Sequence, residues 1–225
     1  MTYKTTLILL FSLFFLGIRA HDDSSCSDSD SSDSSEGHGH HHHGGGGGNG
    51  GGGRNHGCGS WKYFSRPSGG WCMQVFAGRI TQSQAIDQCA GQGARLSGIQ
   101  NAEERAWILR TTQSTVSFAS GAIWIGAERR PNCIRTTNCG RDDSFQWTDG
   151  SATGTSGYRW NDTQPDNSNL DQNCAQLIFS NSQWVRGGQL YEAGTMDDIW
   201  CGGVRTAANA PRETRAYVCG KKSPF

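Results

Sequence analysis

The pattern of apolar and polar positions divides the chain into an apolar start, a polar tail and one long segment of mixed pattern. Lys4 is followed by an almost wholly apolar run over 7–16, which is typical of an export signal over 1–20. The run is shorter than the roughly 20 residues that span a bilayer, and no second run follows, so no membrane span is expected. An uncleaved anchor is the alternative. Residues 21–56 consist of Ser/Asp, His and Gly runs, which predict a disordered tail.

The remaining segment comprises residues 57–225. Two amphipathic helices are predicted near its start, one over 81–89 and one over 101–113. The residues expected to share the buried side are Ala85, Ile86 and Cys89 in the first helix and Ala102, Ala106 and Leu109 in the second. Asn101 and Glu104 have the spacing of a capping box, in which each side chain bonds the backbone of the other residue.

Short strands are predicted over 123–125, 145–147, 175–179 and 216–219, separated by long loops rich in Gly, Asn and Asp. Helices followed by strands favour a single α+β domain of about 165 residues, with its function on the loops.

The export signal makes the nine cysteines candidates for disulfide bonds. Eight of them lie between 58 and 219, while Cys26 lies alone in the acidic tail. Four pairs and one remaining thiol is the simplest count. Cys26 could therefore link two chains in a dimer or be capped by a small thiol.

Charge and histidine content exclude several classes of function. Residues 57–225 contain 17 Lys/Arg and 14 Asp/Glu without a dense basic cluster, so no nucleic-acid binding is expected. All seven histidines precede residue 57, which excludes Ser-His-Asp, Cys-His and His-ligated zinc catalysis in the domain, and no enzymatic activity is expected. Asp142-Asp143 could form a hydrolase pair but is more simply solvated surface. His38 and His40–His43 could bind Zn2+ or Cu2+, or bind metal only incidentally.

Oxygen-bearing side chains are concentrated in two segments, each of which precedes a cysteine. Gln164-Pro165-Asp166 precedes Cys174, and Met196-Asp197-Asp198-Ile199-Trp200 precedes Cys201. Together with Gln172, these segments supply three carboxylates and two side-chain amides. A disulfide between Cys174 and Cys201 would tie both ends and let the oxygens converge. Ca2+ takes roughly six to eight oxygen ligands, so this set predicts a calcium site with open positions for hydroxyl groups.

Several fragments in order resemble the C-type lectin domain. They are Trp124-Ile-Gly126, Phe145-Gln-Trp-Thr-Asp-Gly-Ser151, Trp160, Gln164-Pro-Asp166, Met196-Asp-Asp-Ile-Trp-Cys201 and Tyr217-Val-Cys219. The resemblance covers nearly all of 58–222 and implies the α+β C-type lectin fold. It also implies disulfides between Cys58 and Cys72, Cys89 and Cys219, and Cys174 and Cys201. Cys133 and Cys139 would close a local loop that the basic family pattern lacks.

The resemblance further implies a calcium site and its ligands. By position these are Gln164, Asp166, Gln172, Asp197 and Asp198, with Pro165 in the cis form. The family usually has an acid at the position of Gln172 and Asn at that of Asp197. Because an amide donates and a carboxylate accepts, Gln164 with Asp166 could flank one sugar hydroxyl, and Gln172 with Asp197 the next. The expected function is that of a secreted, calcium-dependent carbohydrate-binding protein, and a role in innate immunity rests on analogy.

The type of sugar and the alternatives follow from single residues. Gln-Pro-Asp is the family triplet for galactose or N-acetylgalactosamine, yet Ser168 stands where galactose binders often have an aromatic ring. Trp200 or Trp184 could supply that ring instead. Asn161 opens a glycosylation sequon whose glycan would crowd the site, or it is an unmodified loop residue. The alternative functions are a lectin-like protein-interaction module and a metal- or mineral-associated protein acting through its acidic, His-rich tail.

Overall fold

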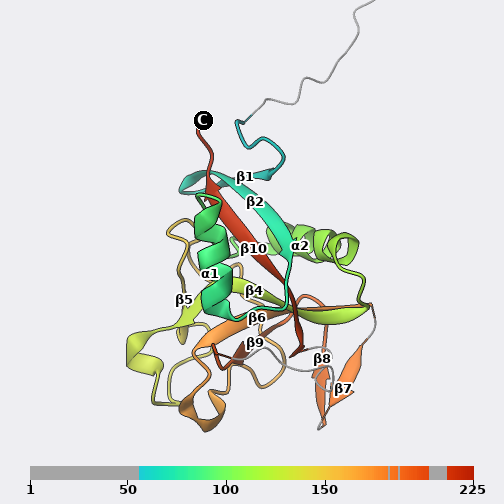
Figure 1. The fold of residues 1–225 in the computed structure, drawn as a ribbon. Helices are drawn as coiled ribbons and strands as arrows, with labels where there is room; N and C mark the ends of the chain where they lie inside the picture. Colours follow the sequence, from blue (N-terminus) through green and yellow to red (C-terminus); the bar gives the residue numbers. More distant parts are fainter. Residues whose placement is uncertain (1–55, 182, 187, 203–211) are drawn as a thin grey trace, which may run out of the picture. The chain divides into compact units, whose positions relative to one another are not determined.

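The computed structural model describes residues 56–181, 183–186, 188–202 and 212–225 (Figure 1). The expected signal, Cys26 and the histidine cluster lie outside the described residues. Both predicted helices are present. Helix α1, Gln82–Gly91, begins after Thr81, whose hydroxyl accepts from the Gln84 N–H at 3.2 Å while the Gln84 side chain accepts from the Thr81 N–H at 2.9 Å. These two bonds form a complete capping box and fix the start of the helix.

Helix α2, Ala102–Thr115, has only half of the predicted capping box. The Asn101 side chain accepts from the Glu104 N–H at 3.0 Å, as expected. The Glu104 carboxylate, however, accepts from the Gln100 N–H and forms an ion pair with Arg66 at 2.7 Å, rather than bonding back to Asn101. Arg66 also pairs with Asp149 at 2.9 Å, and all three side chains are buried. A charged network therefore anchors the first turn of α2 to the sheet.

The predicted buried faces of the two helices are partly wrong. Ala85 and Cys89 are fully buried in α1, but Ile86 is 39% exposed. The buried residues of α2 are Glu104, Ile108 and Thr112, whereas the predicted Ala102 is exposed and Ala106 and Leu109 are half-buried. The reason is the Arg66 ion pair, because it places Glu104 in the interior and rotates the buried stripe away from the most apolar positions.

All four predicted strands are present, within a larger sheet. The strands are β1 Lys62–Arg66, β2 Gly69–Ala77, β3 Arg95–Leu96, β4 Ser120–Arg129, β5 Phe145–Trp147, β6 Cys174–Ser180, β7 Trp184–Arg186, β8 Gln189–Tyr191, β9 Met196–Ile199 and β10 Thr214–Lys222. The main sheet runs β1-β2-β10-β4-β6-β9, with β3 on β10 and β5 on β4, while β7 and β8 pair separately. The pairing of β10 with β4 is parallel.

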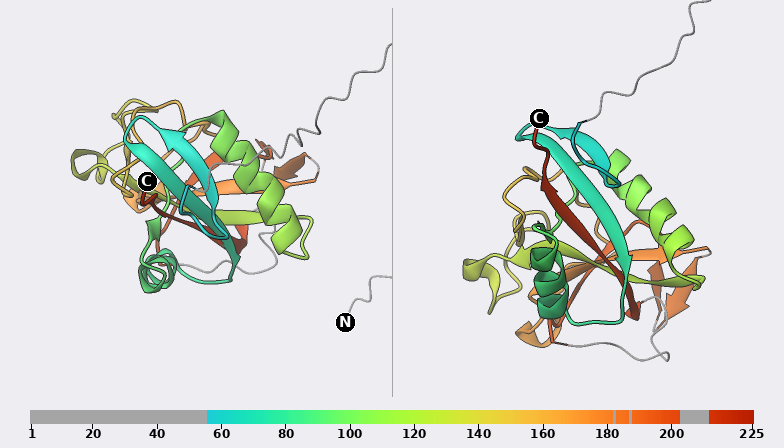
Figure 2. Two further views of the ribbon diagram at one scale, coloured as in Figure 1. Left: turned by 90° about the horizontal axis from the view of Figure 1, so that it is seen from above. Right: turned by 45° about the horizontal axis from the view of Figure 1, so that its top comes forward.

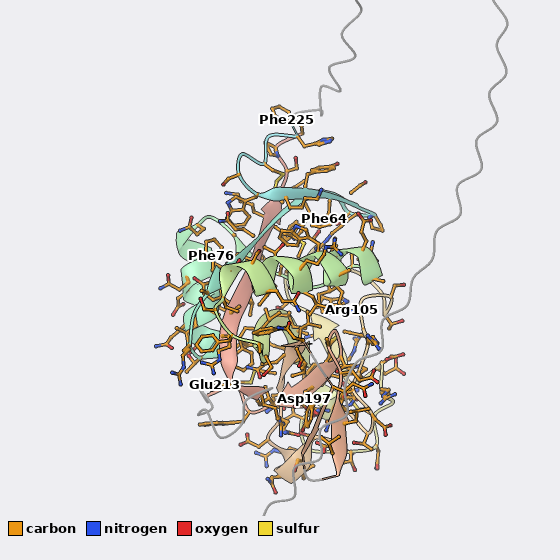
Figure 3. The ribbon with its side chains drawn as sticks, turned by 90° about the vertical axis from the view of Figure 1, so that its right-hand side faces the viewer. Phe64, Phe76, Arg105, Asp197, Glu213 and Phe225 are labelled. Carbon is orange, nitrogen blue, oxygen red and sulfur yellow. A yellow bond between two sulfur atoms is a disulfide. The ribbon has the colours of Figure 1, made fainter. Side chains whose placement is uncertain are left out.

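The helices pack on the first half of this sheet. Helix α1 contacts β3 and β10, and α2 lies along β2 in the views of Figure 2. Phe64 of β1 packs edge-on against Trp107 of α2 with 5.4 Å between ring centroids, and Figure 3 shows Phe64 beside this helix. Fully buried side chains of the core include Met73, Ile99, Ile108, Ile123, Trp124, Ile125, Phe145, Leu177, Ile178, Phe179, Met196 and Ile199. The core therefore extends along β4, β6 and β9, which carry the loops described next.

Four disulfides join the expected pairs, three that the resemblance implies and the local Cys133–Cys139 pair. Cys58 and Cys72 close the first hairpin, and Cys89 and Cys219 tie α1 to β10. Cys174 and Cys201 join the start of β6 to the residues just after β9, while Cys133 and Cys139 close a short loop after β4. Strands β6 and β9 are antiparallel neighbours in which Ala175 lies opposite Asp198. This register brings the Asp197-Asp198 pair next to the loop that enters β6.

Candidate functional site

The loop of residues 161–173 connects Trp160 to β6 and carries three of the five expected calcium ligands. Its Gln164–Pro165 peptide bond is cis, as the resemblance implies. Thr163 and Leu170 have φ values of 65° and 55°, in a left-handed region that β-branched and bulky residues rarely adopt. Such a backbone persists only where surrounding contacts hold it.

The first side of the site is built around Asp166. Its N–H donates to Gln164 Oε1 at 3.0 Å and lies 3.1 Å from Asp198 Oδ1. Gln164 Nε2 lies 3.4 Å from Asp166 Oδ2. Gln164 is buried and Asp166 is exposed. An amide donor and a carboxylate acceptor therefore stand side by side where the loop meets solvent.

The second side is built around the next two N–H groups of the loop. The Asn167 N–H donates to Asp198 Oδ2 at 2.8 Å. The Ser168 N–H donates to Gln172 Oε1 at 2.8 Å and to Asp166 Oδ1 at 3.0 Å. Three successive N–H groups thus connect the oxygens of four expected ligands, which are Gln164, Asp166, Gln172 and Asp198.

Asp198 has a strong cationic partner that sequence reasoning missed. Arg129, at the end of β4, forms an ion pair with Asp198 Oδ2 and donates from Nε to Gln172 O at 2.9 Å. Its guanidinium also lies 4.7 Å from the centre of the Phe145 ring. Burial raises the pKa of the Asp198 carboxyl, while hydrogen bonds and the charge of Arg129 oppose that rise. Burial likewise lowers the pKa of Arg129, against the charge of Asp198.

Asp197 does not join the other four residues. Successive residues of a strand point to opposite faces, so Asp197 leaves β9 on the side away from Asp198. Its Oδ2 lies 2.6 Å from Arg212 Nε, and the side chain is 1% exposed. Figure 3 shows Asp197 in the part of the molecule below α2. The expected pair of Gln172 and Asp197 is therefore not assembled in this structure.

The residues present fit a calcium ion in part. Four oxygen-bearing side chains converge on one loop, and Ca2+ prefers such carboxylate and amide oxygens. Within the described ranges, however, no three acidic, histidine or cysteine side chains are grouped as metal ligands. Arg129 and Arg212 already supply cationic partners to Asp198 and Asp197. To complete the expected set of five calcium ligands, Asp197 would have to leave its ion pair with Arg212 and turn toward loop 161–173.

The residues near the site differ in what they offer to a ligand. Trp200 is 53% exposed and lies two residues beyond Asp198, and Leu170 on the loop is 46% exposed. Ser168 is exposed as well. Trp184 lies on β7, but its side chain is outside the described part of the chain. Trp200 is therefore the aromatic side chain near the loop that the described residues offer to a sugar ring.

Asn161 is fixed inside the fold rather than presented at its surface. Its side chain is 2% exposed, its Nδ2 donates to Leu190 O at 2.7 Å, and its Oδ1 accepts from the Thr195 hydroxyl at 3.2 Å. A glycan on Nδ2 would replace the first bond and displace neighbouring side chains. Asp142 and Asp143 are both exposed, as expected of solvated loop residues.

Comparison with known proteins identifies the family. A family model described as C-type lectin domain-containing protein 141/158 matches residues 65–222. This chain belongs to the C-type lectin domain family. Two curated relatives, C-type lectin domain family 4 member M of Hylobates lar and of Symphalangus syndactylus, are each 28% identical over 125 residues. The match covers 55% of this chain but only 26% and 25% of those relatives, so this C-type lectin chain spans about a quarter of their length.

Solved C-type lectin folds are similar at lower identity. The carbohydrate-recognition domain of cow CD23, solved with a GlcNAc2Man3 oligosaccharide, is 19% identical with a TM-score of 0.45, covering 73% of this chain and 95% of that one. C-type lectin CEL-I of Cucumaria echinata is 22% identical with a TM-score of 0.45, covering 70% and 93%. A Ca2+-dependent type II antifreeze protein is 21% identical with a TM-score of 0.46, covering 72% and 97%. Across the described residues, neither helix has the length and apolar content to cross a bilayer.

Proposed function

We propose that this C-type lectin domain binds carbohydrate through loop 161–173 and the neighbouring end of β9, and that binding depends on calcium. The observation that supports the proposal is the convergence of Gln164, Asp166, Gln172 and Asp198 on three consecutive N–H groups. Five oxygen-bearing residues at family spacing, four of them already together, favour a working site over ordinary loop polarity.

The side chains divide the work of holding a sugar. Gln164, Asp166, Gln172 and Asp198, together with Asp197, would hold a calcium ion. The bound ion would coordinate two neighbouring hydroxyl groups of the sugar. The exposed Asp166 carboxylate would accept a hydrogen bond from a sugar hydroxyl, and the Gln164 amide beside it would donate one to the oxygen of the same hydroxyl. Asp197 pairs with Arg212. The pair of Gln172 and Asp197 can therefore bind the second hydroxyl only when this ion pair opens.

The sugar class proposed is galactose or N-acetylgalactosamine. Gln164 and Asp166 supply the amide and the acid in the order that the family uses for those sugars. Trp200, with its ring half exposed, offers the apolar surface on which the face of a galactose ring stacks.

Retention on immobilised galactose tests the proposal when the exposed Asp166 is substituted. In Asp166→Asn one carboxylate of the site becomes an amide without disturbing buried packing. The matched control is Asp87→Asn, an exposed acid on α1 far along the chain. We expect the parent and the Asp87 variant to be retained in millimolar calcium and released by a chelator, and the Asp166 variant to pass through. Equal retention of all three, or retention that survives chelation, would contradict calcium-dependent binding at this loop.

Changing the triplet tests the sugar class. Gln164→Glu combined with Asp166→Asn reverses the donor and acceptor of the pair, so we expect preference to move from galactose-type to mannose-type sugars on a glycan array. An unchanged preference for galactose would show that Gln164 and Asp166 do not determine the sugar class.

We also propose that the chain is secreted and has no enzymatic activity. Four disulfides suit an oxidising extracellular setting. The chain's histidines all precede residue 57, so the domain has no imidazole to act as a general base. Electrophoresis without reductant decides between the two outcomes for Cys26: a band of twice the monomer mass would show a disulfide-linked dimer, and a monomer band would exclude it.

A further inference from the structure

The centre of the binding loop is attached to the small disulfide loop through Asn167. The Asn167 side chain is 1% exposed, and its Nδ2 lies 3.4, 3.0 and 3.1 Å from the carbonyl oxygens of Cys133, Ile134 and Thr136. Its Oδ1 accepts from the Gln172 N–H at 3.2 Å. One side chain therefore connects the disulfide loop, the centre of the binding loop and the residues that lead into β6.

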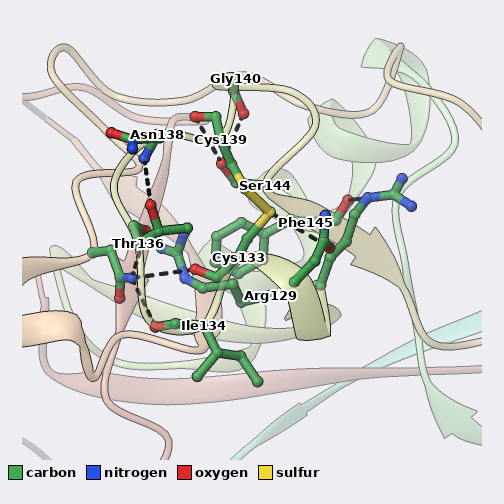
Figure 4. The surroundings of a disulfide bond; sticks show 12 residues. Arg129, Cys133, Ile134, Thr136, Asn138, Cys139, Gly140, Ser144 and Phe145 are labelled. Carbon is green, nitrogen blue, oxygen red and sulfur yellow. Dashed lines mark hydrogen bonds between the residues drawn. A yellow bond between two sulfur atoms is a disulfide. The ribbon is translucent and has the colours of Figure 1, made fainter.

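The disulfide loop is a defined platform for this contact. Figure 4 shows the Cys133–Cys139 bond closing the loop that presents these carbonyl groups. Inside the loop the Asn138 N–H donates to the Thr136 hydroxyl at 3.0 Å. Where the loop rejoins the sheet, the Ser144 hydroxyl donates to Gly140 O at 2.7 Å. The ring closed by the Cys133–Cys139 bond is short and hydrogen-bonded internally. It therefore holds the carbonyl groups that contact Asn167 at fixed positions.

Arg141, just beyond this ring, holds the first limb of the binding loop. Its Nε donates to Gln164 O at 2.5 Å, and its Nη2 donates to Asn161 O at 2.7 Å. The two carbonyls flank the left-handed Thr163, and the Gln164 carbonyl belongs to the cis peptide bond itself. Arg129 contacts the second limb, through Gln172 O at 2.9 Å and the Asp198 carboxylate.

Charge compensation in the site also comes from the protein. Asp166 and Asp198 lie close together, because the Asp166 N–H lies 3.1 Å from Asp198 Oδ1, and like charges at short range repel one another unless a cation compensates them. Asp198 pairs with Arg129 and Asp197 pairs with Arg212. The Asp166 carboxylate is exposed to water and open to an added ion, whereas the buried Asp198 already has a cation beside it.

We propose that Arg129, Arg141 and the Asn167 contact with the Cys133–Cys139 ring form a brace that positions the sugar-binding loop without a metal ion. Calcium then contributes to ligand contact rather than to folding of the loop. The role in sugar binding rests on the proposed function, whereas the brace itself is a property of the metal-free chain. Arg141 and Asn167 are positioning residues, because neither is among the groups expected to touch the ion or the sugar.

Amide hydrogen exchange on the full, oxidised chain tests the brace in the presence of chelator. We expect the N–H groups of 166–168 to be protected in the parent although no calcium is present. In Arg141→Ala, which removes two charged hydrogen bonds, exchange over 163–168 should rise at least about tenfold, the factor that the loss of even one such bond gives. Arg141→Lys keeps the charge but not the two-pronged grip, and should fall between them. The matched control is Arg79→Ala, which removes an exposed arginine paired with Glu213 on another edge.

Calcium and galactose then separate the brace from the proposed function. If both proposals hold, saturating calcium restores protection in Arg141→Ala, and galactose affinity falls about tenfold only when calcium is limiting. Faster exchange in Arg141→Ala with no response to calcium or galactose supports the brace and rejects the proposed function. Parent amides 166–168 that exchange like an unfolded peptide in chelator, or an Arg141→Ala profile equal to that of Arg79→Ala, would overturn the brace.

Discussion

Replacing Arg129 by leucine should be among the most damaging single changes in the domain, although Arg129 is polar. The side chains of Arg129 and Asp198 are 2% and 0% exposed, so the substitution leaves a buried carboxylate with only the N–H groups of Asp166 and Asn167. Removing one partner of a buried ion pair typically costs about 3–5 kcal/mol. The whole domain is expected to have roughly 5–15 kcal/mol of stability, so the variant should fold with a narrow margin.

A double-mutant cycle measures this ion pair directly. Urea unfolding in chelator, followed by tryptophan fluorescence, is compared for the parent, Arg129→Leu, Asp198→Asn and the double variant. Because the double variant no longer buries an unpaired charge, its loss should be smaller than the sum of the single losses by about 1–3 kcal/mol. The control is Arg159→Leu, whose ion pair with Glu192 has 48% and 39% exposed partners and should contribute about 1 kcal/mol or less. Single losses that add within about 0.5 kcal/mol, or an Arg129 loss no larger than that of Arg159, would refute the reasoning.

Three further predictions concern packing, sugar contact and modification. In Gly157→Ala the new Cβ would lie 1.7 Å from Ile99 O, so the melting temperature should fall by several degrees, whereas Gly91→Ala, which has open space, should not lower it. Trp200→Ala should weaken galactose binding while changing the unfolding free energy by only about 1 kcal/mol or less, because the residue is about half exposed; unchanged affinity would exclude stacking there. Peptide mass spectrometry of the secreted chain should find Asn161 unmodified, since its amide is bonded in the interior, and a glycan on most molecules would contradict that placement.

The local sequence pattern was sufficient to predict the helices and strands whose signals lie within a few residues, such as a helix cap. Thr81 and Asn101 open helices where the caps predict, and strand β5 occupies the predicted 145–147. The strands that went unpredicted are mostly short or lie at the sheet edge, such as β3 and β7, where pairing with distant residues decides the conformation. The buried face of α2 was missed for a similar reason. Glu104 reads as a solvent-facing residue until Arg66, 38 positions earlier, is placed beside it.

The candidate site follows the same division between local spacing and distant partners. The spacing of Gln164, Asp166 and Gln172 predicts one cluster, and the structure places them together around shared N–H groups. The partners of the two aspartates could not be predicted, because Arg129 and Arg212 come from other strands and loops. A long, almost wholly buried strand that ends in an arginine is the one local signal that Arg129 has an internal acidic partner.

Asp197 shows how a spacing argument can overreach. Adjacent carboxylates in a sequence suggest a shared ion, but adjacent positions of a strand face opposite ways. Once residues 196–199 are known to form β9, only one of the two aspartates can face loop 161–173 without a rearrangement. The pairing of Asp197 with Arg212 is the consequence.

The most direct measurement is calorimetric titration of calcium into the full, oxidised chain and into its Asp166→Asn variant. Because the acidic tail could also take up calcium, only the difference between the two isotherms reports on the loop. The account predicts that the difference corresponds to one site with a dissociation constant of about 0.1–1 mM, which is present in the parent and missing from the variant. Identical isotherms for the two proteins would place any uptake outside loop 161–173 and contradict the central claim.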